Sequence, residues 1–116
     1  KIKNFSVMPG SETYLLKGLK IGCSGIISAV TNVTATLARK IYEDYKNGKV
    51  SDEDNNLLVN VRAVFDKYNL ISALHTYKSE ENAIYKNLLP PLELLNDKSK
   101  KSLFRELEEL KFRRAA

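Results

Sequence analysis

The 116-residue sequence contains one cysteine, one histidine, one methionine and no tryptophan. The single cysteine, Cys23, excludes a disulfide within the chain and is typical of a reducing compartment such as the cytoplasm. The single histidine, His75, excludes a metal site that relies on several histidines. We therefore expect a cytoplasmic protein that binds no metal and no other cofactor.

The chain also lacks a long apolar run and a segregated charge of one sign. No apolar stretch approaches the roughly 20 residues that a membrane-spanning helix needs, and the first residues do not resemble a signal peptide. The net charge is +5, but lysines and arginines alternate with acids, as in Lys78–Asn82 and Phe104–Arg114. A phosphate-binding face would gather its basic residues on one side. We expect neither a membrane nor a nucleic acid as partner.

Two short apolar stretches near the start of the chain have the pattern of buried strands. Residues 5–8 are followed by a Pro-Gly pair, and residues 24–30 are rich in β-branched side chains. Between them, Ser11 is a suitable N-cap for a helix of leucines at helical spacing, and Gly22 can end that helix. A strand, a short helix and a strand within about 25 residues predict a βαβ unit with parallel strands.

The rest of the chain predicts helices, because apolar residues recur at a spacing of three and four positions. The Pro90–Pro91 pair stops the third of these helices and leaves a connector before the last. Their expected bounds are Asn32 or Thr34 to Gly48, Ser51 to Tyr68, Leu70 to Leu88 with a break near Lys78–Ser79, and Asp97 to Leu110.

The two predicted strands raise a physical problem. A pair of parallel strands has unpaired N–H and C=O groups on both outer edges, and parallel sheets normally have more strands with helices on both faces. We therefore expect residues 24–30 to lie between neighbours that this sequence does not contain. The chain, which begins at Lys1 and not at a methionine, is expected to be the end of a larger α/β protein.

Several glycines and their neighbours resemble the strand-7 to strand-8 segment of the dihydrodipicolinate synthase / N-acetylneuraminate lyase family. These proteins are Schiff-base aldolases and lyases built on a (β/α)8 TIM barrel. The resemblance implies an α/β fold, with the last two βα units in residues 1–48 and a three-helix C-terminal extension in residues 49–116. The residues that carry it are Gly10–Glu12, Gly18–Leu19, Gly22, Gly25–Ser28, Asn32–Val33 and Tyr85–Leu95.

The resemblance also implies a substrate site at the carboxyl ends of the two strands, where barrel enzymes carry their active sites. Main-chain carbonyls near Gly10 and Ile27 would line the pyruvate pocket, and Glu12 and Thr13 would approach the second substrate. Two simpler explanations stay open: Glu12 favours the positive end of a helix, and Gly10 is required by the turn itself. The predicted substrate-binding residues are Gly10, Ser11, Glu12, Thr13, Ile27 and Ser28.

The family's chemistry requires a lysine whose amine attacks the keto carbon of a 2-oxo acid. Such a lysine must lie in a desolvated pocket, whereas Lys17 and Lys20 belong to an amphipathic helix and the predicted strands contain none. The resemblance places the catalytic lysine upstream of Lys1. We therefore expect this segment alone to be inactive and to need the missing N-terminal barrel portion as partner.

Departures from the family's patterns narrow the expected substrate. Residues 67–79 contain no proline, which argues against the synthase of lysine biosynthesis, and Ala29 replaces a serine that contacts the sugar acid in neuraminate lyases. Sugar-acid substrates such as 2-keto-3-deoxy acids remain, in a homo-oligomer that is a dimer or a tetramer. The alternative is a stand-alone helical protein-interaction module without catalysis, which the absence of a nucleophile in the chain would explain.

Overall fold

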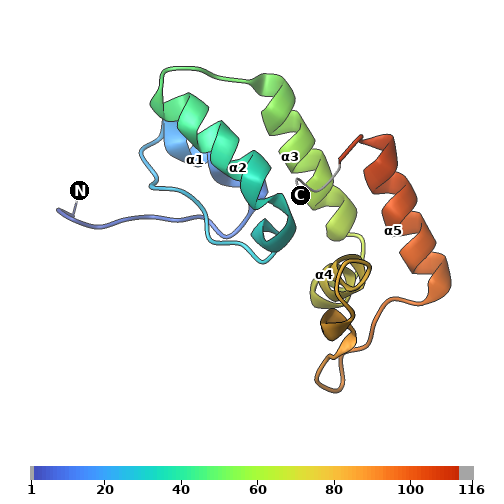
Figure 1. Ribbon diagram of the computed structural model, residues 1–116. Coiled ribbons are helices and arrows are strands. Elements are labelled where there is room, and N and C mark those ends of the chain that lie inside the picture. The colour runs from blue at the N-terminus through green and yellow to red at the C-terminus, as the bar shows by residue number, and fades with distance from the viewer. Residues whose placement is uncertain (1, 113–116) are drawn as a thin grey trace. The chain divides into compact units, whose positions relative to one another are not determined.

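The computed structural model describes residues 2–112, and every regular element within this range is helical (Figure 1). The chain divides into two compact units, Lys1–Val59 and Asn60–Ala116, and the boundary lies inside the third α-helix. The elements are η1 (Glu12–Tyr14), α1 (Leu15–Lys20), α2 (Thr31–Lys46), α3 (Asp52–Phe65), α4 (Leu70–Ser79), η2 (Ala83–Lys86) and α5 (Asp97–Glu109).

The prediction of strands at residues 5–8 and 24–30 is wrong for this chain, because neither segment is a strand. The two segments nevertheless run side by side in the same direction. The N–H of Ser24 donates to the carbonyl of Val7 at 2.9 Å, and the N–H of Ile27 donates to that of Pro9 at 3.1 Å. Pro9 has no N–H to return a bond, so no regular parallel ladder forms between them.

A second reason for the missing strands is the exposure of both segments. Phe5 is 67% exposed and Ile27 is 72% exposed, whereas Val30, at the start of the next helix, is fully buried. This chain does not itself cover residues 24–29, which are exposed or half-buried. An edge with unpaired backbone groups and exposed apolar side chains has nothing here to complete a sheet.

The first helical turn begins where the sequence predicts. The hydroxyl of Ser11 accepts a hydrogen bond from the N–H of Thr13, and η1 then continues into α1. Gly22 follows the C-cap of α1 with φ +94°, a conformation that favours glycine. Gly18 has a packing reason instead, since a Cβ on it would lie 3.3 Å from the Cβ of Cys23.

Helix α2 starts earlier than either predicted cap. It begins at Thr31, and its N-cap Val30 offers no side-chain hydrogen bond. Thr34 is not the cap but a buried residue inside the first turns, and Asn32 donates from its side chain to the carbonyl of Ala29. Gly48 closes the helix with φ +77°, as predicted.

The first unit has a small apolar core between its helices. α1 packs against α2 (Figure 1), and the start of α3 adds Leu58, which is fully buried. Ser51 caps α3 by accepting from the N–H of Asp54 at 3.2 Å. The core residues are Leu15, Leu19, Ala38, Ile41 and Leu58, with Ile26, Leu37, Tyr42 and Tyr45 packed against them.

In the second unit, the predicted break near Lys78–Ser79 is confirmed as the end of α4. Asn69 caps α4 by accepting from the N–H of Ser72 at 3.1 Å. The short turn η2 then takes the place of the predicted helical residues up to Leu88. The last helix begins at Asp97, as predicted, and is capped by Asn96.

Aromatic rings and polar bonds connect the helices of the second unit. Tyr77 of α4 lies edge-on to Phe65 and stacks on Phe104 of α5, with ring centroids 5.8 and 5.5 Å apart. The buried hydroxyl of Thr76 accepts from the N–H of Leu95 at 3.0 Å and so holds the connector that leads to α5. Within residues 2–112, no helix combines the length and apolar character that crossing a membrane requires.

Candidate functional site

The predicted site residues lie where the two side-by-side segments end. The hydrogen bond from Ile27 to Pro9 fixes this register, and a Cβ built on Gly10 would lie 3.9 Å from the carbonyl oxygen of Ile27. The structure therefore brings Gly10 and Ile27 together. It also brings together their neighbours Glu12 and Ser28, which are 16 positions apart in the sequence. This much agrees with the geometry that the resemblance implies.

Gly10 is not explained by the backbone conformation of its turn. The glycines with positive φ within residues 2–112 are Gly22, Gly25 and Gly48. A side chain on Gly10 would make only an ordinary contact at 3.9 Å. The expectation that the turn demands a glycine here is therefore not supported, and the absence of a side chain leaves free space beside the carbonyl of Ile27.

The carbonyl oxygens of Gly10 and Ile27 are available to a ligand. Both residues are exposed, and neither carbonyl accepts a hydrogen bond from the residues that the structure describes. Exposed carbonyls are solvated by water, so leaving them unpaired has little energetic cost. A ligand with hydrogen-bond donors, such as a hydroxyl group, can approach both.

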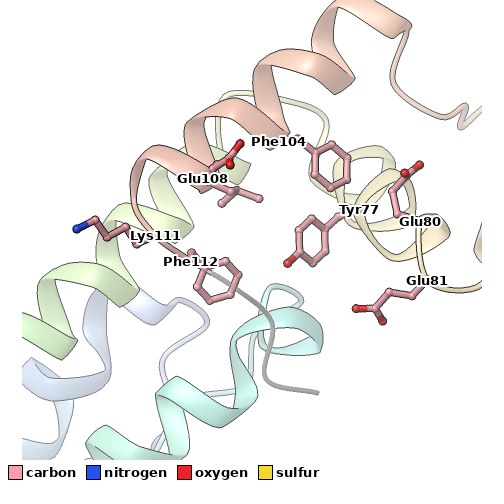
Figure 2. A pocket seen from close by; sticks show the side chains of 8 residues that line it. Tyr77, Glu80, Glu81, Phe104, Glu108, Lys111 and Phe112 are labelled. Carbon is pink, nitrogen blue, oxygen red and sulfur yellow. The ribbon is translucent and has the colours of Figure 1, made fainter.

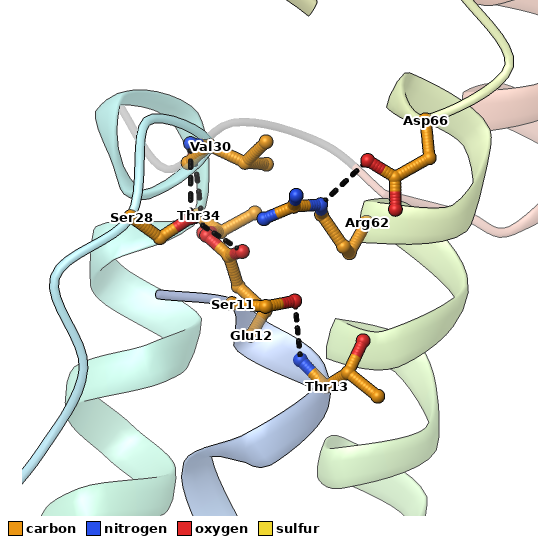
Figure 3. Close-up of polar contacts among 8 residues, drawn as sticks. All are labelled: Ser11, Glu12, Thr13, Ser28, Val30, Thr34, Arg62 and Asp66. Atoms are coloured by element: carbon orange, nitrogen blue, oxygen red, sulfur yellow. Dashed lines mark hydrogen bonds and ion pairs between the residues drawn. The ribbon is translucent and has the colours of Figure 1, made fainter. Parts of the chain in front are cut away.

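Glu12 is the one acidic side chain that is buried among the predicted site residues. It is 0% exposed, and its Oε2 accepts a hydrogen bond from the hydroxyl of Ser28 at 2.7 Å (Figure 3). Its Oε1 lies 3.2 Å from the hydroxyl of Thr34 in α2. Burial of a carboxyl group is costly unless hydrogen bonds replace water. These hydrogen bonds give Glu12 a role in holding the fold locally, which is distinct from both the substrate contact and the helix-end role considered from the sequence.

The other two predicted site residues make local contacts. Ser11 caps η1, and its carbonyl accepts from the N–H of Tyr14 at 3.0 Å. Thr13 is half-buried beside Glu12 in η1. Sequence reasoning missed the role of Thr34, which it considered only as a helix cap. Its sequence signal is weak, because a threonine near a helix start is ordinarily a cap.

The described residues do not supply the groups that metal or lysine chemistry needs. Within residues 2–112, no three His, Cys, Asp or Glu side chains are placed to hold a metal ion. Every lysine in this range is exposed or half-buried, including Lys17 and Lys20 of α1. A lysine in contact with water stays protonated at neutral pH and is a poor nucleophile.

The second unit has a groove that contains none of the predicted site residues (Figure 2). It encloses about 790 Å³ between α4 and α5. The Tyr77 and Phe104 rings form its apolar floor, and carboxylates surround it, of which Glu80 is paired with Lys100. Its one lysine, Lys111, is exposed and not held in a desolvated pocket, so we do not assign the groove to catalysis. Its lining residues are Tyr77, Glu80, Glu81, Phe104, Leu107, Glu108, Lys111 and Phe112.

Solved structures share this arrangement of helices and segments. The chain matches dihydrodipicolinate synthase DapA-2 from Bacillus anthracis with a TM-score of 0.82 and 18% identity, over 93% of this chain and 38% of that one. It matches a prophage protein of the dihydrodipicolinic acid synthase family from Escherichia coli K12, solved in complex with pyruvate, with a TM-score of 0.76 and 22% identity, over 92% of this chain and 37% of that one. The chain thus has the fold of a part of these barrels.

Sequence comparison relates the chain to the same group of proteins. The chain is 48% identical over 46 residues to a Coccidioides immitis (strain RS) protein that is provisionally named a mitochondrial 4-hydroxy-2-oxoglutarate aldolase. That match covers 40% of this chain and only 15% of the relative. The sequence model of the dihydrodipicolinate synthetase family matches residues 1–110. Since this match covers nearly the whole sequence, the chain belongs to the dihydrodipicolinate synthetase family.

Proposed function

We propose that this chain is the C-terminal part of a Schiff-base aldolase or lyase that forms or cleaves a C–C bond of a 2-oxo acid. The observation that carries the proposal is the family match over residues 1–110. The match includes both compact units, so it does not favour a stand-alone helical interaction module. The chain spans about 38% of the barrel that it resembles with a TM-score of 0.82, and catalysis requires the remainder.

The reaction begins with a lysine that this segment does not provide. A deprotonated amine attacks the keto carbon, water leaves, and the resulting iminium withdraws electrons so that a neighbouring C–C bond forms or breaks through an enamine. Since no lysine within residues 2–112 is buried, the nucleophile comes from outside the described residues. We propose that it lies upstream of Lys1 in the complete protein.

This chain would then contribute one wall of the substrate pocket. The carbonyls of Gly10 and Ile27 are exposed and available, and the missing side chain of Gly10 leaves space beside them. The pyruvate complex of the E. coli relative supports a 2-oxo acid as the ligand. We propose that Ser11, Thr13 and Ser28 border the same pocket.

The exposed apolar segments support completion of the barrel by further strands. Side chains such as Phe5, Val7 and Ile27 would be buried if strands paired with the free edges of residues 5–8 and 24–27. We propose a hydroxylated 2-oxo acid, such as a 2-keto-3-deoxy acid, as substrate, which agrees with the name of the C. immitis relative. The dimeric or tetrameric state and the cytoplasmic location stay predictions.

Trapping with borohydride tests the proposal. The chain is mixed or co-expressed with the part of the C. immitis relative that precedes its matched segment, here called the barrel complement. Pyruvate and borohydride should then leave a reduced pyruvyl group on a lysine of the complement, detected by mass spectrometry, because borohydride reduces the iminium irreversibly. The chain alone should acquire none.

Two controls sharpen this experiment. The Gly10→Val variant should associate with the barrel complement but form less adduct, because its side chain occupies the space beside the carbonyl of Ile27. The complement joined to its own C-terminal part shows that the assay works. The proposal fails if that positive control forms adduct and the complex with this chain forms none.

A further inference from the structure

The buried carboxyl group of Glu12 connects three parts of the chain that are distant in sequence. It belongs to η1, Ser28 ends the second extended segment, and Thr34 lies 22 positions away in α2. All three belong to the first unit. A side chain with 0% exposure cannot be reached by a substrate without movement of the surrounding chain. Its role must therefore be exerted through its neighbours.

The contact with Ser28 is the stronger of the two. The hydroxyl of Ser28 donates to Glu12 at 2.7 Å, whereas the single hydrogen of the Thr34 hydroxyl is shared between Glu12 at 3.2 Å and the carbonyl of Val30 at 3.1 Å. A shared hydrogen makes two weaker bonds than one directed hydrogen. Glu12 therefore holds Ser28 more firmly than it holds Thr34.

Ser28 in turn organises the turn that leads into α2 (Figure 3). Its hydroxyl accepts from the N–H of Val30 at 3.3 Å. Its carbonyl accepts from the side chain of Thr31 and from the N–H of the same residue. Ile27 precedes Ser28 directly, so the orientation of its carbonyl beside Gly10 depends on the same turn.

We propose that Glu12 is a positioning residue: through Ser28 it fixes the carbonyl of Ile27 at the pocket wall and does not itself touch substrate. This inference rests on the proposed function. Glu12→Gln keeps the size of the side chain but replaces one acceptor oxygen with an amide nitrogen that cannot accept from Ser28. Ser28→Ala removes the donor of the same bond. Both changes act on this bond; Glu12→Gln also alters the contact with Thr34, and Ser28→Ala also removes the acceptor of the Val30 N–H.

The first test measures the rate of pyruvate trapping in the complex with the barrel complement. Each single variant should lower it about tenfold, equivalent to about 1.4 kcal/mol, the size of one hydrogen bond. The double variant should lose no more than the more severe single variant, because all three lack the same bond. Losses that multiply would overturn the proposal, as would a rise only in the KM of the second substrate, which indicates direct contact.

A matched control separates positioning from general stability. Thr34→Val preserves side-chain volume and removes the other hydroxyl beside Glu12, so it should reduce stability with a smaller loss of trapping than Ser28→Ala. Equal losses at the same reduction in stability would mean that Glu12 merely stabilises the fold, and would overturn the proposal.

The second test uses the chain by itself and does not depend on catalysis. Hydrogen exchange at the N–H of Val30, which donates to Ser28, should be faster in Glu12→Gln, whereas exchange in the middle of α2 should be unchanged. Unaltered exchange at Val30 would refute the link from Glu12 to the turn. If the complex with the unmodified chain forms no adduct, but exchange at the N–H of Val30 is faster in Glu12→Gln, the proposed function fails and the link from Glu12 to the turn remains.

Discussion

Replacing Leu58 with alanine removes the central side chain of the first unit's core. Leu58 is 0% exposed and lies in one cluster with leucines of α1 and with Ala38 and Ile41 of α2. Leu→Ala substitutions in cores cost about 2–5 kcal/mol, depending on how far the cavity collapses. α1 has only six residues and is followed by the exposed residues Ile21 and Gly22, so its end can move partly into the space. We therefore expect a loss of about 3 kcal/mol.

The assay is urea unfolding of the full chain, monitored by the circular dichroism signal of helices at about 222 nm. A loss of about 3 kcal/mol corresponds to a melting temperature lower by about 12 °C for a chain of this size. Leu89→Ala is the matched control, since Leu89 is 84% exposed and should change stability by less than about 0.5 kcal/mol. The core assignment is refuted if Leu58→Ala costs less than about 1 kcal/mol or no more than the control.

Two further predictions concern polar contacts. The hydrogen bond from Lys40 lowers the pKa of Asp54 below its ordinary 3.8, so the pair stabilises the fold above that pH and the contribution is lost as pH falls through the lowered pKa. Asp54→Asn should thus be less stable than the unmodified chain at neutral pH and equally stable in acid; a difference that persists in acid contradicts this. Asn69→Ala removes the cap that accepts from Ser72 and should cost about 1 kcal/mol in urea unfolding. The same change at the exposed Asn60 within α3 is its control, and equal effects would show that the cap contributes nothing.

Local signals in the sequence located most helix ends correctly. Ser11, Gly22 and Gly48 act as the sequence predicts, because a side-chain oxygen or a residue free to adopt positive φ decides the end of a helix within a few positions. The start of α2 was predicted too late, at Asn32 or Thr34. The hydroxyl of Thr34 bonds to the distant Glu12 and to Val30 instead of capping, and no local pattern contains that information.

The candidate site also has one feature that the sequence indicated and one that it did not. The resemblance indicated that Gly10 and Ile27 meet, and the register of the two segments brings them together. It did not indicate that Glu12 would be fully buried against Ser28. Neither the substrate role nor the helix-end role considered for Glu12 includes this contact. Burial depends on which elements cover a residue, and periodicity cannot supply this.

The sequence by itself determined most of the helices, several of their ends and the family, because these depend on neighbours within a few positions and on a motif that survives in the residues. Only the tertiary structure decided that residues 5–8 and 24–30 do not form strands and that Glu12 acts on Ser28. A strand needs partners on its edges, and a buried carboxyl group needs donors brought from elsewhere in the chain. Both conditions are set by contacts between distant segments.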